Sequence, residues 1–353
     1  MPSDADKTML AEILHQPEAW AATLEIVHSN VERLQDLARG VDEVVFTGCG
    51  SGLNAAVAIA PCFQHVTGVR ARAVPAAEIV FYPETVFDRK SPYLVVGISR
   101  SGSTTEVVSA QRAVAGWGYP TLAITCHPNS PLARASSVAL VLEPANEASV
   151  TTTQSLTSMI LSGQVMAGIV ADDTDYLDQL AQLPALGRGL IEPSHELGRR
   201  IAQESGITKF AFVASGPLRG LAREAQLKVK EMVLAPSDSY PLLDFRHGPK
   251  SNVNEQMLVT LLSGDRMRRV EVEFLEEMKD LGGKLFVICD EAEASLAAPA
   301  DHLFEVRSRL PDFARSILQM LPVHFLAYYK SLAVGLSPAE PVNLSYWVET
   351  ARL

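Results

Sequence analysis

A buried strand that runs directly into a hydroxyl-rich turn constrains the fold of this chain more than any other stretch. The run at 93–98 is short, apolar and rich in β-branched residues without alternation, as in a parallel strand covered on both faces. Ser-Arg-Ser-Gly-Ser-Thr follows at 99–104, and residues 107–114 then show helical spacing. The turn therefore leads from a strand's carboxyl end to a helix amino terminus, where N–H groups and the helix dipole favour an anion.

The turn has two interpretations. Ser and Thr are common helix caps, so the hydroxyls can simply begin the helix. Alternatively, they form a phosphate cradle with the backbone N–H groups, and Gly102 lets the backbone approach a ligand closely. The turn alone does not separate the two, because a cap and an anion site use the same N–H groups. The four hydroxyl donors are Ser99, Ser101, Ser103 and Thr104.

Strands and helices alternate along the first half of the chain. Strands predicted at 43–47, 71–74, 93–98, 120–125 and 138–142 are separated by helical segments, which implies a parallel sheet with helices on both faces. The first strand runs into a glycine turn at 48–52, at the sheet edge where ligands collect. Its Gly-x-Gly-x-Gly spacing is not the dinucleotide fingerprint, and no acidic residue ends the next strand, so a nucleotide site is not favoured.

The second half repeats the first. The strand at 209–214 with its Ser-Gly-Pro turn has the same strand–turn order as 44–52. The strand–turn–helix–strand pattern of 122–141 recurs at 285–306. The economical interpretation is two copies of one α/β unit. The second copy's turn at 263–266 lacks the hydroxyl cluster, so we expect one phosphate site per chain. We also predict two helices over 8–39 broken at Pro17, a long helix over 156–171, and a helix start at Ser194.

Composition excludes several classes of protein. The net charge is −11 and no basic run is present, so no nucleic-acid partner is expected. The four cysteines lack metal or CxxC spacing, and no His pair has metal-ligand spacing, so we expect reduced thiols and no metal. No signal peptide and no apolar run near about 18 residues is seen, which predicts a cytoplasmic protein without a membrane span.

Two segments of the second copy carry candidate proton-transfer groups. Glu224, Lys228 and Glu231 fall at i, i+4 and i+7, so they share one helix face. On spacing alone, a solvated face with an internal ion pair is the more ordinary interpretation. His247 lies in an irregular loop before Gly-Pro, which favours a proton-transfer role, whereas His324 in an apolar helix is expected in the core.

With these motifs, the chain resembles the sugar isomerase (SIS) domain family, with two tandem SIS units. It is similar to the isomerase half of glucosamine-6-phosphate synthase and to stand-alone aminosugar-phosphate isomerases, deaminases and deglycases. The resemblance rests on 49–51, 99–104, 147–154, 224–231, 247–249 and 343–345. It implies an α/β fold of two flavodoxin-like three-layer sandwiches. We expect N-terminal helices over 1–39, a first unit with the phosphate site over 40–180, a second unit with the catalytic groups over 200–340, and a tail closing the site over 341–353.

The resemblance also implies roles for individual residues. Glu231 matches the carboxylate that moves a proton between C1 and C2, with Glu224 and Lys228 supporting it. His247 matches a His that assists ring opening in the partner subunit's site, which implies a homodimer with shared active sites. Arg100 replaces a Gln of the synthase and adds a charge able to reach the phosphate, beside Ser99, Ser101, Ser103 and Thr104. The implied sugar contacts are Cys49, Gly50, Ser51, Val150 and Thr152.

Three departures from the synthase narrow the implied activity. Its glutaminase domain has no counterpart, so we expect no glutamine-dependent synthesis from this chain alone. Its imine-forming tail Lys is Tyr346 here, and a second Lys is Gln154. An isomerase, deaminase or deglycase acting on a 6-phosphorylated aminosugar without a cofactor remains. The alternative is a non-catalytic phosphosugar-binding regulator, although no helix-turn-helix or basic arm accompanies it.

Overall fold

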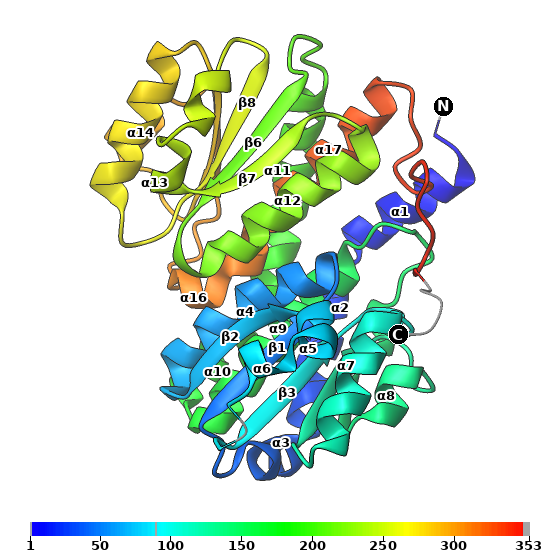
Figure 1. Ribbon diagram of the computed structural model, residues 1–353. Coiled ribbons are helices and arrows are strands. Elements are labelled where there is room, and N and C mark those ends of the chain that lie inside the picture. Colours follow the sequence, from blue (N-terminus) through cyan, green and yellow to red (C-terminus); the bar gives the residue numbers. More distant parts are fainter. Residues whose placement is uncertain (1, 89, 349–353) are drawn as a thin grey trace. The chain divides into compact units, whose positions relative to one another are not determined.

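The chain folds into two compact units, each built on one parallel sheet (Figure 1). The computed structural model describes residues 2–88 and 90–348, so the predicted tail at 341–353 lies partly outside the described residues. One unit comprises the chain up to Leu14 together with Ala185–Leu344, and the other comprises His15–Pro184 with the tail from Ser345 onward. Each unit contains a five-stranded sheet, which confirms the predicted pair of α/β units.

The unit that begins at His15 contains the first sheet, in the order β2-β1-β3-β4-β5 with all neighbours parallel. Its strands are β1 (Glu43–Gly48), β2 (Arg70–Pro75), β3 (Tyr93–Ile98), β4 (Thr121–Thr125) and β5 (Val138–Val141). Its helices are α2 (Gln16–His28), α3 (Val31–Ala38), α4 (Ser51–Thr67), α5 (Ala76–Phe81), α6 (Pro83–Val86), α7 (Thr105–Gly116), α8 (Pro131–Ala135), η1 (Glu143–Ala145), α9 (Gln154–Ala171) and α10 (Thr174–Ala181).

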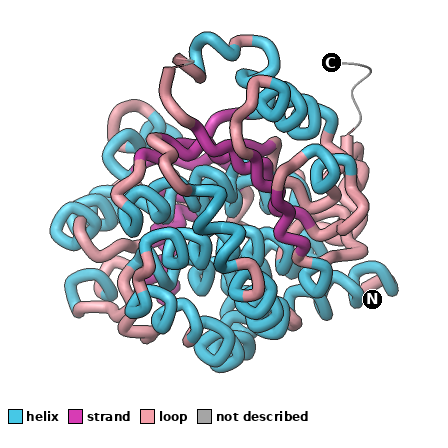
Figure 2. The backbone as a smooth tube through the Cα atoms, turned by 90° about the horizontal axis from the view of Figure 1, so that it is seen from below, coloured by secondary structure: helices cyan, strands magenta, loops and turns pink. Residues whose placement is uncertain are grey.

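Helices cover both faces of this sheet, which explains why its strands are apolar without alternation. On one face, the ring of Phe46 in β1 meets that of Phe63 in α4 edge-on, with centroids 5.5 Å apart. On the other, Val45 and Val95 belong to a buried cluster that includes residues of α5 and α7. Successive strand residues therefore enter opposite cores. Figure 2 shows the strands as short magenta segments with helices around them.

The second sheet has the order β10-β9-β8-β6-β7, also parallel throughout. Written from β7, this order matches β2-β1-β3-β4-β5, which confirms the internal repeat. Its strands are β6 (Lys209–Ala214), β7 (Ser237–Pro241), β8 (Met257–Leu262), β9 (Lys284–Cys289) and β10 (His302–Glu305). Its helices are α1 (Asp4–Leu14), α11 (Leu183–Ala202), η2 (Gly216–Leu218), α12 (Arg219–Val233), α13 (Leu242–Phe245), η3 (Pro249–Asn252), α14 (Arg268–Asp280), α15 (Ala294–Ala297), α16 (Asp312–Arg315), η4 (Ser316–Met320) and α17 (Leu321–Ala333).

The first helix of the chain packs with this second sheet's unit. The hydroxyl of Tyr328 in α17 donates to the Asp6 carbonyl at 3.1 Å, and the hydroxyl of Ser337 donates to the Asp6 carboxylate at 2.7 Å. These bonds join α1 to residues more than 300 positions away in the sequence.

Two sequence expectations about local structure are wrong. Residues 8–39 span three helices instead of two, because the chain turns again at Ser29 and Asn30. Ser194 does not begin a helix; it lies inside α11 and is fully buried. The apolar face of α11, which includes buried Leu197 and Ile201, continues the helix past Pro193. Among the described residues, no helix is long and apolar enough to cross a bilayer.

Candidate active site

Two predicted turns lie side by side at the carboxyl edge of the first sheet. β1 and β3 are neighbours, and Gly48 pairs with Ile98 at their ends, so Cys49–Ser51 and Ser99–Thr104 begin at the same edge. The turns approach closely, because a Cβ at Gly52 would lie 2.4 Å from the Ile98 carbonyl oxygen. Gly50 has φ +52°, a conformation that favours glycine.

Cys49 is not a nucleophile at neutral pH. Burial, and then the nearby charge of Glu106, raises the pKa of the Cys49 thiol to about 11. The thiol therefore stays protonated, and only the thiolate is reactive. Cys49 is therefore a packing residue at the start of the glycine turn, where it is partly buried against the cluster that includes Val45 and Val95.

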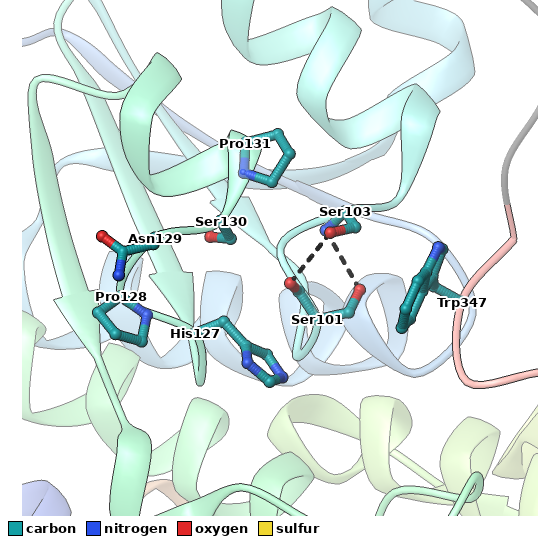
Figure 3. A pocket seen from close by; sticks show the side chains of 8 residues that line it. All are labelled: Ser101, Ser103, His127, Pro128, Asn129, Ser130, Pro131 and Trp347. Carbon is teal, nitrogen blue, oxygen red and sulfur yellow. Dashed lines mark hydrogen bonds between the residues drawn. The ribbon is translucent and has the colours of Figure 1, made fainter.

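The hydroxyl-rich turn is ordered by its own side chains. The hydroxyls of Ser99 and Thr104 share a hydrogen bond of 3.0 Å, which closes the turn from end to end. The Ser103 N–H donates to the Ser101 hydroxyl at 3.2 Å, and the Ser103 hydroxyl donates to the Ser101 carbonyl at 3.4 Å (Figure 3). Thr104 then precedes the first residue of α7. The turn thus has a preset shape that requires little ordering upon ligand binding.

The rest of the sheet edge fixes the turn in place. The Arg100 carbonyl accepts from the Cys126 N–H at 2.9 Å, and the Gly102 carbonyl accepts from the Leu132 N–H at 2.9 Å. Gly102 has φ +60°, and a Cβ there would lie 2.2 Å from the Ser130 hydroxyl oxygen. Only glycine fits at this position, because the backbone passes close to Ser130.

The Arg100 side chain leads away from the turn toward the loop before α9. Its guanidinium donates to the carbonyls of Ser149 and Val150 at 2.8 and 2.9 Å, and one nitrogen lies 4.0 Å from the Glu147 carboxylate. The residue is 6% exposed. Arg100 therefore joins the predicted phosphate turn to the predicted sugar segment within one unit.

Glu147 fixes that same loop from inside. Its buried carboxylate accepts the N–H groups of Thr153, Gln154 and Ser155 at 2.7, 2.9 and 3.3 Å, and it also accepts two hydroxyls. A carboxylate at the start of α9 is stabilised by these donors and by the helix dipole. The loop so held contains two predicted sugar contacts, half-buried Val150 and buried Thr152.

A pocket of about 380 Å³ opens beside the turn. Figure 3 shows Ser101 and Ser103 between Pro128 and Asn129 on one side and the indole of Trp347 on the other, with His127 below. His127 follows β4, and Trp347 comes from the tail. The pocket therefore combines hydroxyls, an amide, an imidazole and an aromatic face, which suits a polar ligand with an apolar ring surface.

Helix α12 in the other unit carries three ionisable groups in contact. The Lys228 ammonium lies 3.1 Å from the Glu224 carboxylate and 2.6 Å from that of Glu231. The side chains of Glu224 and Lys228 are 0% and 1% exposed, so a solvated face does not describe them. Burial alone would lower the pKa of Lys228, but the two carboxylates outweigh burial and raise it. Glu231, 18% exposed, is the member that solvent or a ligand can reach.

His247 lies in the same unit as Glu231, in the turn after α13. The side chain is exposed, the backbone N–H of His247 donates to the Asp244 carbonyl at 3.0 Å, and Gly248 has φ +128°. Two neighbouring cations, Arg246 and Lys250, bind Glu277 of α14 at 2.7 and 2.5 Å. The loop is thus anchored on both sides of an accessible imidazole.

The predicted residues form two groups. The turn, the glycine corner and the loop before α9 lie together in one unit, and the α12 cluster and His247 belong to the other. Sequence reasoning missed His127, although the rule that ligands meet strand carboxyl ends would have found it after β4. It also missed Trp347 as a pocket residue, because its partners lie about 220 to 246 positions earlier. The described residues contain no cluster of His, Cys, Asp or Glu suited to a metal.

Known proteins resemble this chain in sequence and in fold. The SIS domain model matches residues 39–168 and 207–328. Glutamine–fructose-6-phosphate aminotransferase (isomerizing) of Pseudomonas putida is 26% identical, over 96% of this chain and 58% of its own length. Tagatose-6-phosphate ketose/aldose isomerase of Escherichia coli has a TM-score of 0.85 and 24% identity, covering 97% of this chain and 99% of that one. Glucosamine-6-phosphate deaminase of Thermotoga maritima has a TM-score of 0.73 and 26% identity, with coverage of 93% and 99%.

Proposed function

The chain belongs to the SIS domain family, and from this membership we propose that it is an enzyme that isomerises a 6-phosphorylated aminosugar with release of the amine. The observation that carries the proposal is the α12 cluster, in which a buried lysine holds a reachable carboxylate, Glu231, at 2.6 Å. A binding protein has no need of such a group, whereas aldose–ketose proton transfer requires one. The isomerase and deaminase named among the relatives support this class of reaction.

The phosphoryl group would bind at the turn. Ser99, Ser101, Ser103 and Thr104 supply hydroxyls at the start of α7, whose dipole favours an anion. Because the protein has a net charge of −11, such local donors are needed to hold a negative ligand. Binding at this remote group orients the carbon skeleton for the chemical step.

Glu231 would transfer the proton. As a carboxylate it removes the proton from C2 of the open-chain aminoaldose, the electron pair forms the C1–C2 double bond of an enolamine, and the aldehyde oxygen O1 takes up a proton. Glu231 then returns the proton to C1, and the nitrogen gives up one proton as the C2=N bond forms, which replaces the proton that O1 took up. The product is a ketose imine, which water hydrolyses to the ketose phosphate and ammonia. His247 would pass protons between hydroxyls during ring opening. Lys228 keeps Glu231 in place, and Glu224 also binds the buried ammonium.

Glu231→Gln tests the proposal. We expect turnover to fall by about 10³-fold or more, because the amide cannot accept the proton, while phosphosugar affinity stays within about twofold. The assay follows ammonia and ketose phosphate together with glucosamine 6-phosphate, and scans fructose and tagatose 6-phosphates for isomerisation. Glu276→Gln, an exposed carboxylate of α14, is the matched control. Full activity in Glu231→Gln contradicts the proposal.

The second candidate is a phosphosugar-binding regulator. The observation that favours a regulator is that the turn and the residues lining the pocket include none from α12, so a ligand could bind there without the Glu231 cluster. Tight binding of a hexose 6-phosphate by the wild-type protein, with no turnover of any aminosugar phosphate in the same panel, supports the regulator over the enzyme.

A further inference from the structure

We propose that Arg100 is a positioning residue that holds the tail against the phosphate turn through Tyr346, so that Trp347 forms a wall of the substrate pocket. The inference deepens the proposed function and rests on it for the identity of the ligand. It assigns the sugar-binding wall of the site to Trp347 and gives Arg100 a role distinct from contacting the phosphoryl group. All the residues concerned lie in one unit.

The first step is the set of groups that the guanidinium already binds. Arg100 donates to three carbonyls, those of Ser149, Val150 and Tyr346, at 2.8, 2.9 and 3.1 Å. The Glu147 carboxylate lies 4.0 Å away, so an internal anion faces the charge. The planar fork of arginine matches several fixed acceptors, whereas a single ammonium cannot. Arg100 therefore joins the loop before α9 to the tail.

The second step is the set of contacts that hold Tyr346. Its ring lies under the Arg100 guanidinium, 3.8 Å from centroid to carbon, which is a cation–π contact. Its hydroxyl has two acceptors within hydrogen-bonding distance, the Asn146 side-chain oxygen at 2.9 Å and the Glu147 carbonyl oxygen at 2.8 Å. The tail is therefore fixed at this residue by ring, hydroxyl and backbone carbonyl together.

The third step is the position that the fixed Tyr346 gives to Trp347. Trp347 follows Tyr346 directly, and their rings meet edge-on with centroids 5.7 Å apart. Trp347 is 45% exposed and lines the pocket with Ser101, Ser103 and His127 (Figure 3). An indole beside a phosphate turn presents an apolar face to the C–H groups of a sugar ring. Displacing Tyr346 would remove that wall and leave the turn itself intact.

The first experiment needs no ligand. Trp117→Phe removes an exposed indole, so that in this background acrylamide quenching is dominated by Trp347, the other indole, Trp20, being fully buried. We expect Arg100→Gln and Tyr346→Ala each to raise the quenching constant by about twofold or more, and Arg100→Lys to give an intermediate value. The double variant should raise it at least as far as either single one, because Arg100→Gln leaves the bonds of the Tyr346 hydroxyl and Tyr346→Ala leaves the backbone carbonyl at 346. Unchanged quenching in Tyr346→Ala, with near-UV circular dichroism like the parent's, overturns the proposal.

The second experiment separates positioning from phosphate binding. Calorimetry with inorganic phosphate and with fructose 6-phosphate compares wild type, Arg100→Gln and Tyr346→Ala. We expect inorganic phosphate affinity to change less than about twofold, because its donors remain, and fructose 6-phosphate affinity to fall by about tenfold, which is 1.4 kcal/mol. An equal loss for both ligands makes Arg100 a direct phosphate contact and refutes the positioning role. Should wild type bind neither ligand, the proposed function fails, and the quenching result still decides whether Arg100 holds the tail.

Discussion

The charged residue at the centre of α12 illustrates how burial and pairing oppose each other. Lys228 is almost fully buried, and its charge is retained only because Glu224 and Glu231 face it. Removing both carboxylates would leave the buried ammonium without a counter-charge, which costs about 3–5 kcal/mol, whereas removing Glu231 alone leaves Lys228 paired with Glu224. At His324 in α17, by contrast, burial and the charge of Lys228 both lower the pKa.

We predict an acid-sensitive contribution of His324 to stability. Burial, and then the Lys228 charge, lowers the pKa of His324 from 6.5 to about 3. Between these values the unfolded chain binds a proton that the folded protein does not, so stability falls as the pH drops below 6.5, by about 1.4 kcal/mol per unit. In His324→Gln this slope is removed. Urea unfolding at pH 7 and 5 should show the variant's deficit shrinking at pH 5; a constant deficit contradicts the prediction.

At the scale of residues, spacing predicted which side chains meet but not how deeply they lie. The i, i+4, i+7 pattern of α12 was sufficient to place Glu224, Lys228 and Glu231 together. It could not reveal that α12 is covered by α17, because that contact depends on residues about 100 positions later. The stack of Arg100 on Tyr346 was equally inaccessible, since long-range contacts leave no local pattern.

At the scale of elements, the two copies differ at one corner. In the second copy, the turn after β8 is occupied by the protein's own carboxylates. Glu271 accepts the Ser263 hydroxyl at 2.6 Å and the Gly264 N–H at 3.1 Å, and Asp312 accepts the Asp265 N–H at 3.2 Å. These are the groups that would bind an external anion, so the corner that corresponds to the proposed phosphate turn is already occupied by carboxylates of the protein itself.

This arrangement predicts one phosphoryl site per chain. Calorimetric titration with inorganic phosphate should fit a single site, which Ser99→Ala weakens, because that change removes the hydroxyl bonded to Thr104. Glu271→Gln should leave this site unchanged and lower the free energy of unfolding by about 1–3 kcal/mol, since it weakens buried hydrogen bonds. Two equivalent sites in wild type contradict the prediction.

The sequence predicted the elements well where they are buried on both faces. Strand β3 is a continuous apolar run bounded by turns, and β1 and the long helix α9 are largely apolar and almost entirely buried. β7 was not predicted, because Ser-Asp-Ser-Tyr-Pro is polar and the strand lies at the edge of its sheet, paired only with β6. The Ser194 error arose because a local cap signal was weighed above the apolar face of α11.

At the scale of the whole molecule, the resemblance implies that active sites are shared between subunits, with His247 entering the partner's site. If so, mixing two inactive variants restores activity. Glu231→Gln and His247→Ala subunits, denatured and refolded together, should give about a quarter of wild-type activity, because half of the random dimers are mixed and each holds one intact site. Each variant refolded alone is the control. Absence of recovery, with mixed dimers verified by differential tags, contradicts sharing.

Each end of the chain belongs to the unit that is built mainly from the other half of the chain. The helix that carries Asp6 is bonded to Tyr328 and Ser337, and the tail residue Tyr346 is bonded to Arg100. Cutting the chain at the boundary near Pro184 would therefore yield two incomplete fragments. One would carry the hydroxyl-rich turn without Tyr346, and the other would lose the helix α1 that packs against α17. Although the two sheets share one strand order, neither half is self-contained, and neither can be transplanted without a short segment from the far end of the chain.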